Sequence, residues 1–190
     1  MTGDELEILL ENSGAILNGH FLLTSGRHSN RYIEKFRVLE KPVALDKICQ
    51  QMARIFEEKN IQIVLGAAIG GILIAGGVGR HLGVKHIFSE RVNGKMELRR
   101  GFDLPPGIRV LIVEDIITTG GSVFELIELA QQCKAEIVGV VNLVERSATS
   151  IDFGVNSTPL LNLPSESWEK NNCPLCRDNI PFTQRGRTGK

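Results

Sequence analysis

The sequence predicts an α/β fold in which helices flank a parallel β-sheet. Three continuous apolar runs have the length and composition of buried strands, and they lie at residues 61–68, 109–113 and 136–144. Glycine-rich turns follow the first two runs, and apolar residues then recur with helical spacing at 72–82 and 122–133. Alternating buried strands and helices are typical of a parallel sheet, whose ligands bind beyond the carboxyl ends of the strands. We therefore expect functional residues in the two glycine-rich turns.

The first 40 residues predict one helix and two strands. Thr2 and Glu5 have the spacing of a capping box and precede an apolar face, which predicts a helix over residues 3–13. Residues 20–24 and 32–39 have the composition of strands and flank a turn-rich segment.

The remaining segments supply a helix, a strand and a charged hairpin. A helical period begins at Pro42, a residue favoured in the first turn, and runs to Phe56. Residues 86–90 have strand character, and residues 91–101 predict a hairpin or long loop that carries several cations. The tail from Pro164 onward is predicted to be irregular because it is rich in proline and glycine.

Length and composition indicate one globular domain. The 190 residues suffice for one core but hardly for two, and 42% apolar with 23% charged residues exclude a disordered or fibrous chain. We therefore expect a single domain over residues 1–190. Basic and acidic residues both number 22, so no overall field favours nucleic acid or an anionic membrane as a partner.

Three features point to a cytoplasmic protein. The first residues are acidic where a secretory signal would be basic. The most apolar stretch, residues 66–79, is too short and too rich in glycine to span a bilayer. The cysteines lack the spacing of a disulfide framework, so we expect reduced thiols at Cys49, Cys133, Cys173 and Cys176.

The turn after the second apolar run has the composition of a ribose-phosphate site. Its strand delivers Glu114 and Asp115 to the sheet edge, and hydroxyl residues with two glycines then lead into a helix at Ser122. Backbone N–H groups in such a turn form an anion nest that the helix dipole reinforces, and adjacent carboxylates can accept hydrogen bonds from ribose hydroxyls. A P-loop is a poorer match because Gly-x-x-x-x-Gly-Lys-Ser/Thr is absent. The simpler alternative is a tight turn in which Ser122 caps the helix.

The complete string is more specific than its parts. An apolar strand followed by Glu114-Asp115-Ile116-Ile117-Thr118-Thr119-Gly120-Gly121-Ser122 resembles the donor-binding signature of type I phosphoribosyltransferases. Residues 19–29, 90–102 and 143–146 are similar to the hood, the loop and the base-binding segment of the orotate-specific members. The resemblance implies a parallel sheet flanked by helices, a mobile loop, and a hood formed by about residues 1–40 with part of the C-terminal tail.

The resemblance also implies an activity. Orotate phosphoribosyltransferases transfer the phosphoribosyl group of 5-phosphoribosyl-1-pyrophosphate to orotate, giving orotidine 5′-monophosphate and pyrophosphate in pyrimidine biosynthesis. The implied cofactor is Mg²⁺, held mainly by substrate phosphates, so no metal ligands are expected on the protein for this reaction. In this family the cationic loop reaches into the neighbouring subunit, which implies a homodimer with shared active sites.

Site residues follow from the same resemblance. The implied catalytic residues are Lys95 and Asp115. Donor binding is implied for Glu114, Asp115, Ile116, Ile117, Thr118, Thr119, Gly120, Gly121, Ser122, Arg91 and Lys95. The implied pyrophosphate loop is Ala68, Ile69, Gly70 and Gly71, and orotate is expected at Thr118 and Arg146, whose guanidinium can grip a carboxylate with two parallel hydrogen bonds. Thr24 departs from the pattern, because many orotate enzymes have a lysine there, so one ionic contact is missing or supplied elsewhere.

Cys173 and Cys176 have the spacing of half a zinc site. No second pair has suitable spacing, so we interpret them as two reduced cysteines that pack a turn. A zinc or redox role stays open, because a partner subunit, His20 or His28 would complete the ligation. His28 itself is interpreted as a hydrogen-bonded structural histidine.

Two other functions compete with orotate transfer. A purine phosphoribosyltransferase would share the donor but lack a carboxylated base, and Arg146 and the hood segment argue against it. A regulator that senses the donor and binds nucleic acid is disfavoured by the zero net charge and by the intact cationic loop.

Overall fold

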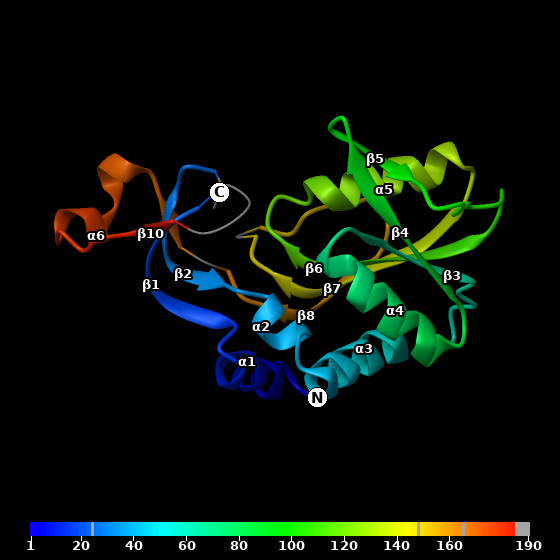
Figure 1. The fold of residues 1–190 in the computed structure, drawn as a ribbon, viewed down its shortest axis with the longest axis horizontal. Coiled ribbons are helices and arrows are strands. Elements are labelled where there is room, and N and C mark those ends of the chain that lie inside the picture. Colours follow the sequence, from blue (N-terminus) through cyan, green and yellow to red (C-terminus); the bar gives the residue numbers. More distant parts are fainter. Residues whose placement is uncertain (24, 148, 165, 185–190) are drawn as a thin grey trace.

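The computed structural model describes residues 1–23, 25–147, 149–164 and 166–184. Within these residues the chain forms a larger and a smaller sheet (Figure 1). The larger sheet has the strand order β5 (Lys95–Leu98), β4 (Lys85–Val92), β3 (Ile63–Ala67), β6 (Arg109–Ile117), β7 (Glu136–Glu145) and β8 (Ser157–Asn162). All its pairings are parallel except the hairpin of β4 with β5. The predicted α/β fold with a parallel sheet is confirmed.

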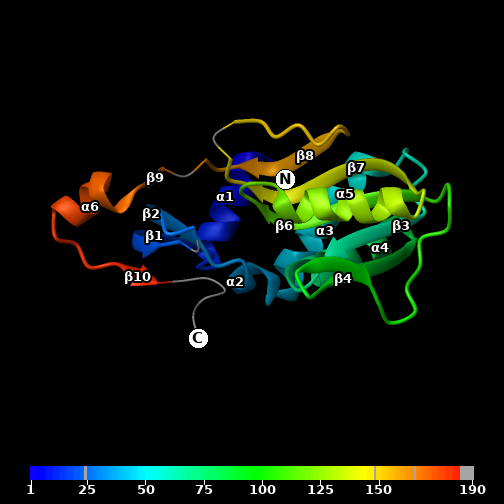
Figure 2. The ribbon, with the colours of Figure 1, turned by 90° about the horizontal axis from the view of Figure 1, so that it is seen from above.

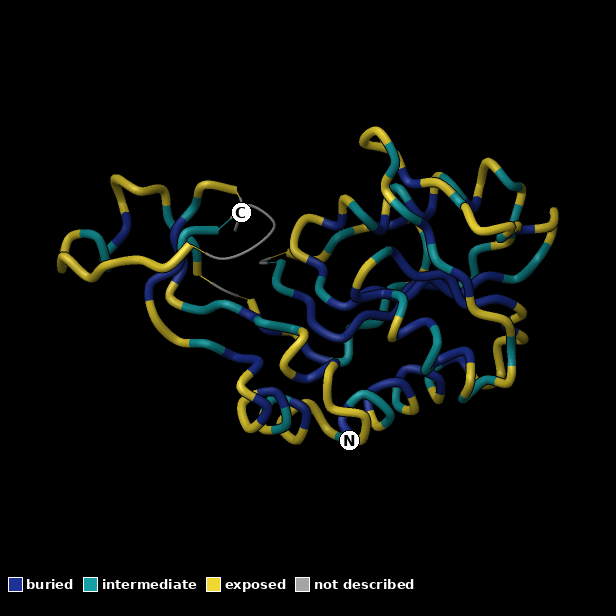
Figure 3. The backbone as a smooth tube through the Cα atoms, in the orientation of Figure 1, coloured by how far each residue is buried: buried dark blue, intermediate teal, exposed yellow. Residues whose placement is uncertain are grey.

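Helices cover both faces of the larger sheet (Figure 1). On one side lie α3 (Pro42–Phe56) and α4 (Gly70–Leu82), and on the other lies α5 (Gly121–Gln132). Alternate residues of β6 serve the two sides: Leu111 and Val113 pack with α3 and α4, whereas Val110 and Ile112 pack with α5. Both faces are therefore buried, which explains the continuous apolar runs (Figure 3).

The first helix forms as its capping box predicts. In α1 (Gly3–Asn12) the Glu5 N–H donates to Thr2 Oγ1 at 3.2 Å, and the Thr2 N–H donates to Glu5 Oε2 at 2.8 Å. Leu6 and Leu10 are buried beneath it. Among the described residues, no helix is long and apolar enough to cross a membrane.

The smaller sheet joins the two ends of the chain. Its order is β10 (Thr183–Gln184), β1 (Ile16–Leu22), β2 (His28–Ile33) and β9 (Ser167–Trp168), and we call it the hood sheet. The segment between β9 and β10 contains η1 (Lys170–Asn172) and α6 (Pro174–Arg177), so the tail is less irregular than its composition suggests. The hood sheet lies beyond one end of the larger sheet in two perpendicular views (Figures 1 and 2).

Three predicted boundaries are wrong. The strand predicted at 20–24 begins earlier, because β1 spans Ile16–Leu22. The strand predicted at 32–39 occurs at 28–33, because β2 pairs with β1 from Leu22↔His28 to Ile16↔Ile33, and residues 36–39 form the short helix α2 (Phe36–Leu39). Val38 and Leu39 are buried in that helical turn, so packing decides against an extended strand. Residues 114–117 belong to β6 rather than to the following turn, because they continue the ladder with β7.

Candidate active site

The predicted anion nest lies between β6 and α5. Residues 118–120 form the turn, and Gly120 has φ +77°, a left-handed conformation that favours glycine. A Cβ there would also lie 2.8 Å from the ring of Phe153. Gly120 is the N-cap of α5, and no described side chain caps this helix, so its first backbone N–H groups remain available to an anion. The alternative of Ser122 as the cap is wrong.

Two adjoining cavities bring most of the predicted residues together. The nest forms one of about 310 Å³, lined by residues 116–123 with Arg91, Glu114 and Glu125. The other cavity, of about 720 Å³, lies between residues 32–36, where β2 ends and α2 begins, and the ends of β3, β6 and β7. Both are lined by Glu114, Ile116, Thr118, Thr119 and Ser122. The larger cavity adds Tyr32, Ile33, Glu34, Lys35, Phe36, Ala67, Ala68, Ile69, Gly70, Asp115 and Arg146.

Asp115 is held by a cation that the sequence did not reveal. Its side chain is only 4% exposed, and Lys35 Nζ lies 2.6 Å from its Oδ2. The Ile116 N–H donates to the other oxygen, Oδ1, at 2.6 Å. Lys35 belongs to no recognisable motif, so no local signal could have found it.

The neighbouring acid has a different electrostatic environment. Glu114 is buried, and its Oε1 accepts a hydrogen bond from the Asp115 N–H at 2.9 Å. Burial, followed by the nearby Asp115 carboxylate, raises the pKa of Glu114 to about 8. The protonated form of Glu114 is therefore favoured near neutral pH, so the pair combines a hydrogen-bond donor with an ion-paired acceptor.

The glycine turn after β3 approaches this acid pair closely. The peptide bond between Ala68 and Ile69 is cis, and the Ile69 side chain is 71% exposed. A Cβ on Gly70 would overlap Asp115 Oδ2, so only glycine fits there. Gly71 packs against Gly66 and is not among the residues that line either cavity.

Arg146 reaches the same cavity from the end of β7. Its backbone N–H donates to Ile117 O at 2.8 Å, which ties it to the end of β6. Its guanidinium donates to Arg31 O at 3.3 Å, and burial lowers its pKa. Arg146 and Thr118 therefore line one cavity, as expected for a pair that would hold a carboxylated base.

The cationic segment forms the hairpin of β4 and β5. Arg91 reaches the nest, where it pairs with Glu125 of α5 at 2.8 Å, and Arg100 pairs with Glu90 at 3.0 Å. Lys95 is exposed, and it is not among the residues that line the two cavities. Within this one chain, Lys95 is therefore not brought to Asp115.

Comparison with known proteins identifies the family. The model of the phosphoribosyl transferase domain matches residues 37–153, more than half of the chain. An orotate phosphoribosyltransferase of Desulforamulus reducens is 47% identical over 98% of this chain and 97% of its own length. The chain belongs to the orotate phosphoribosyltransferase family. A second orotate phosphoribosyltransferase, from Thermotoga maritima, is 41% identical over 95% of this chain and 97% of its own length.

Solved structures agree with membership in the orotate phosphoribosyltransferase family. The orotate phosphoribosyltransferase of Aeropyrum pernix has a TM-score of 0.71 at 25% identity, covering 83% of this chain and 93% of that one. The Mycobacterium tuberculosis enzyme in complex with inorganic phosphate has a TM-score of 0.68 at 26% identity, covering 84% of this chain and 94% of that one. An adenine phosphoribosyltransferase from Thermoanaerobacter pseudethanolicus shares the fold, with a TM-score of 0.62 at 17% identity over 70% of this chain and 88% of that one.

Proposed function

We propose that the enzyme transfers the phosphoribosyl group of 5-phosphoribosyl-1-pyrophosphate to orotate, releasing orotidine 5′-monophosphate and pyrophosphate in pyrimidine biosynthesis. The observation that carries this proposal is that an anion nest, an acid pair and the half-buried Arg146 line one continuous site. The donor requires the first two groups, and the carboxylate of orotate requires the third.

The donor's ribose phosphate fits the end of β6. Its 5′-phosphate would accept hydrogen bonds from the N–H groups and hydroxyls of residues 118–122. Its ribose hydroxyls would meet Glu114 and Asp115. The protonated Glu114 would donate a hydrogen bond, and the Asp115 carboxylate, which pairs with Lys35, would accept one. Ile116 and Ile117 would contribute backbone groups and apolar surface to the wall of the donor site.

The base would lie between Thr118 and Arg146. The guanidinium of Arg146 offers parallel N–H donors to the orotate carboxylate, and the hydroxyl of Thr118 offers a further contact. Purine bases lack that carboxylate and would not form this charge-assisted contact with Arg146. This difference favours orotate over a purine as the acceptor.

Mg²⁺ fits this site mainly as a companion of the donor. Asp115 is already occupied by Lys35 and the Ile116 N–H, and Glu114 favours its protonated form, so the acid pair offers little free carboxylate to a cation. A hard cation of this kind binds phosphate oxygens readily and would neutralise the leaving pyrophosphate. Ala68, Ile69 and Gly70 line the larger cavity, and their backbone groups would contact the leaving pyrophosphate.

Lys35 is the candidate for the ionic contact absent at Thr24, which lies outside the described residues. Its ammonium lies in the larger cavity beside the acid pair, where a negatively charged donor would also be bound. A lysine at this place orients Asp115 and adds positive charge near the phosphates. We therefore assign Lys35 to donor binding as well as to positioning Asp115.

The hairpin with Lys95 is proposed to act on a second subunit. Lys95 and Arg99 form no ion pair with any described residue, so their charges are available to an anion in a neighbouring site. A hairpin that closes in this way would neutralise pyrophosphate and exclude water. The proposal thus includes a homodimer with shared active sites, and a cytoplasmic location in keeping with four free cysteines.

A panel of bases tests the acceptor. Purified enzyme with donor and Mg²⁺ is offered orotate, adenine, guanine or xanthine, and nucleotide products are separated by chromatography. Orotidine 5′-monophosphate is the expected product. Faster turnover of any purine than of orotate would identify a purine as the acceptor. Nucleic-acid binding without turnover of any base would instead favour a regulator.

A further inference from the structure

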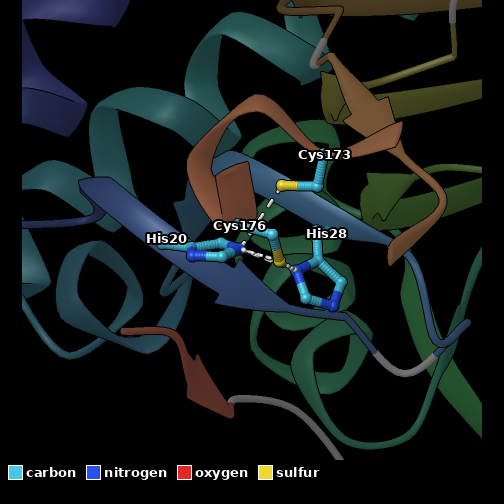
Figure 4. Close-up of side chains that lie close together, drawn as sticks. All are labelled: His20, His28, Cys173 and Cys176. Carbon is cyan, nitrogen blue, oxygen red and sulfur yellow. Dashed lines mark hydrogen bonds between the residues drawn. The ribbon is translucent and has the colours of Figure 1, made fainter. Parts of the chain in front are cut away.

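Four side chains with metal-binding atoms meet in the hood, away from the two cavities. They are His20 of β1, His28 of β2, Cys173 before α6 and Cys176 within it (Figure 4). Their ligand atoms all lie within 4.8 Å of one another. None of the four is among the residues that line the active-site cavities. Transfer of the phosphoribosyl group therefore does not account for this cluster.

Three separations between a ligand sulfur and a ligand nitrogen are close to those around one tetrahedral ion. Bonds of about 2.3 Å to sulfur and about 2.0–2.1 Å to nitrogen place tetrahedral N and S ligands roughly 3.6 Å apart and two N ligands roughly 3.3 Å apart. Cys173 Sγ and Cys176 Sγ lie 3.5 and 3.9 Å from His20 Nε2, and Cys176 Sγ lies 3.4 Å from His28 Nδ1. His20 Nε2 and His28 Nδ1 are closer, at 2.6 Å, so a small separation of the two rings would admit the ion.

A hydrogen bond from His20 fixes the tautomer of its ring in the form that a metal ligand requires. Its Nδ1 lies 2.7 Å from Ile180 O, and because a carbonyl only accepts, this nitrogen carries the proton. The lone pair of the neutral ring is then on Nε2, the atom that faces His28 and the two sulfurs. A backbone carbonyl that fixes the tautomer in this way is a common feature around metal-bound histidines.

The cluster is also shielded from water. His20 is 4% exposed, His28 is 2% and Cys173 is 0%, and Cys176 is half-buried. The ring of Phe182 packs edge-on against both imidazoles, with centroids 5.7 Å from His20 and 5.2 Å from His28. Four protein ligands in a closed setting are typical of structural zinc sites, whereas catalytic sites keep a position open.

We propose that His20, His28, Cys173 and Cys176 bind one structural Zn²⁺ that fastens the C-terminal segment to the hood sheet. On binding, each thiol releases a proton to solvent and becomes a thiolate, while both imidazoles bind as neutral rings. Two thiolates balance the two positive charges of the ion. The closed site is therefore neutral overall, which suits its burial.

The segment between β9 and β10 needs such a fastening. It contains a three-residue η1 and a four-residue α6, and neither has a buried residue. Helices this short are not stable by themselves in water. A zinc ion would link Cys173 and Cys176 to two strands about 150 residues earlier, and its binding free energy would add to folding. The same strand β2 leads to Tyr32 and Lys35, so the zinc would also hold the hood wall of the active site.

Metal content provides the direct test. Protein purified without chelators is equilibrated with Zn²⁺, dialysed and analysed by plasma mass spectrometry. We expect about one zinc per chain in the wild type and in Cys133→Ser, whose thiol lies outside the cluster, and less than about a tenth in Cys176→Ser. Less than a tenth of a zinc in the wild type, or equal retention by Cys176→Ser and Cys133→Ser, would overturn the proposal.

A spectroscopic measurement on the wild type avoids the risk that a variant misfolds. Co²⁺ in place of zinc should give thiolate charge-transfer bands and the intense visible bands of a tetrahedral site, and added Zn²⁺ should abolish them. A chelator should then make two further thiols reactive toward a thiol reagent. Bands of an octahedral aqua-like ion would contradict the assignment, as would a disulfide between Cys173 and Cys176 in protein kept under reducing conditions.

Discussion

The ammonium of Lys35 lies 2.6 Å from Oδ2 of Asp115, joining the segment after β2 to the end of β6. Asp115 is nearly fully buried, and its carboxylate lies so close to Gly70 that a Cβ there would overlap Oδ2. One contact thus connects the hood side of the larger cavity with the acid pair. Donor binding should depend on both partners.

We expect Asp115→Asn to weaken donor binding or turnover while the chain stays folded. A lost charge-assisted hydrogen bond is worth about 1.5–3 kcal/mol, or roughly 10- to 150-fold. Lys35→Gln should act in the same direction, and Lys47→Gln, on an exposed face of α3, should have no effect. Because Lys35 and Asp115 act as a pair, the double variant should lose less than the product of the single losses. A folded Asp115→Asn enzyme with unchanged turnover and donor KM would remove Asp115 from the site.

The buried Glu114 should make folding stability depend on pH. Its pKa is raised from 4.5 to about 8 in the folded chain, so it contributes stability that is complete below 4.5 and is lost as the pH rises through 8. Within that window the loss is at most about 1.4 kcal/mol per pH unit. Glu114→Gln does not titrate. Denaturant unfolding at several pH values should show the wild type losing stability relative to Glu114→Gln as the pH rises, and a pH-independent difference would refute the raised pKa.

Arg146→Ala should impair orotate more than the donor. Loss of the bidentate contact with a carboxylate is expected to cost about 2–3 kcal/mol, or roughly 30- to 150-fold in kcat/KM for orotate. The donor KM should change far less, because Arg146 lies at the base end of the cavity. Arg54→Ala, on the exposed side of α3, is the matched control. Orotate kinetics within twofold of the wild type would refute this assignment.

The shared site can be tested by mixing two inactive variants. Lys95→Ala disables the hairpin and Asp115→Asn disables the donor pocket, and each alone is expected to be nearly inactive. If the hairpin acts on the partner, a mixed dimer has one intact site and one doubly defective site. Random reassortment makes about half of the dimers mixed, so activity should recover to roughly a quarter of the wild type. Verified subunit exchange with only the average of the two variant activities would show that each hairpin serves its own chain.

Local patterns predicted the larger sheet and the nest, because each buried strand and the glycine turn are formed by residues that are consecutive in the sequence. Contacts between distant segments could not be read in this way. Lys35 and Asp115 are 80 residues apart in the sequence, and the two histidines are about 150 residues from the two cysteines. No periodic pattern in the sequence indicates either contact. The strand predicted at 32–39 failed for a related reason, since burial of Val38 and Leu39 outweighed the extended preference of the segment.

The two adjoining cavities form one continuous site that is proposed to bind the phosphoribosyl donor and orotate for reaction, and orotate absorbance tests this most directly. Purified enzyme is mixed with orotate, donor and Mg²⁺, and the fall in absorbance is followed while released pyrophosphate is measured in parallel. We expect orotate to be consumed with an equal amount of pyrophosphate formed, and consumption to stop when donor is omitted. At low orotate, consumption should slow roughly 30- to 150-fold when Arg146→Ala replaces the wild type. Unchanged orotate absorbance with folded wild-type enzyme would show that orotate is not the acceptor.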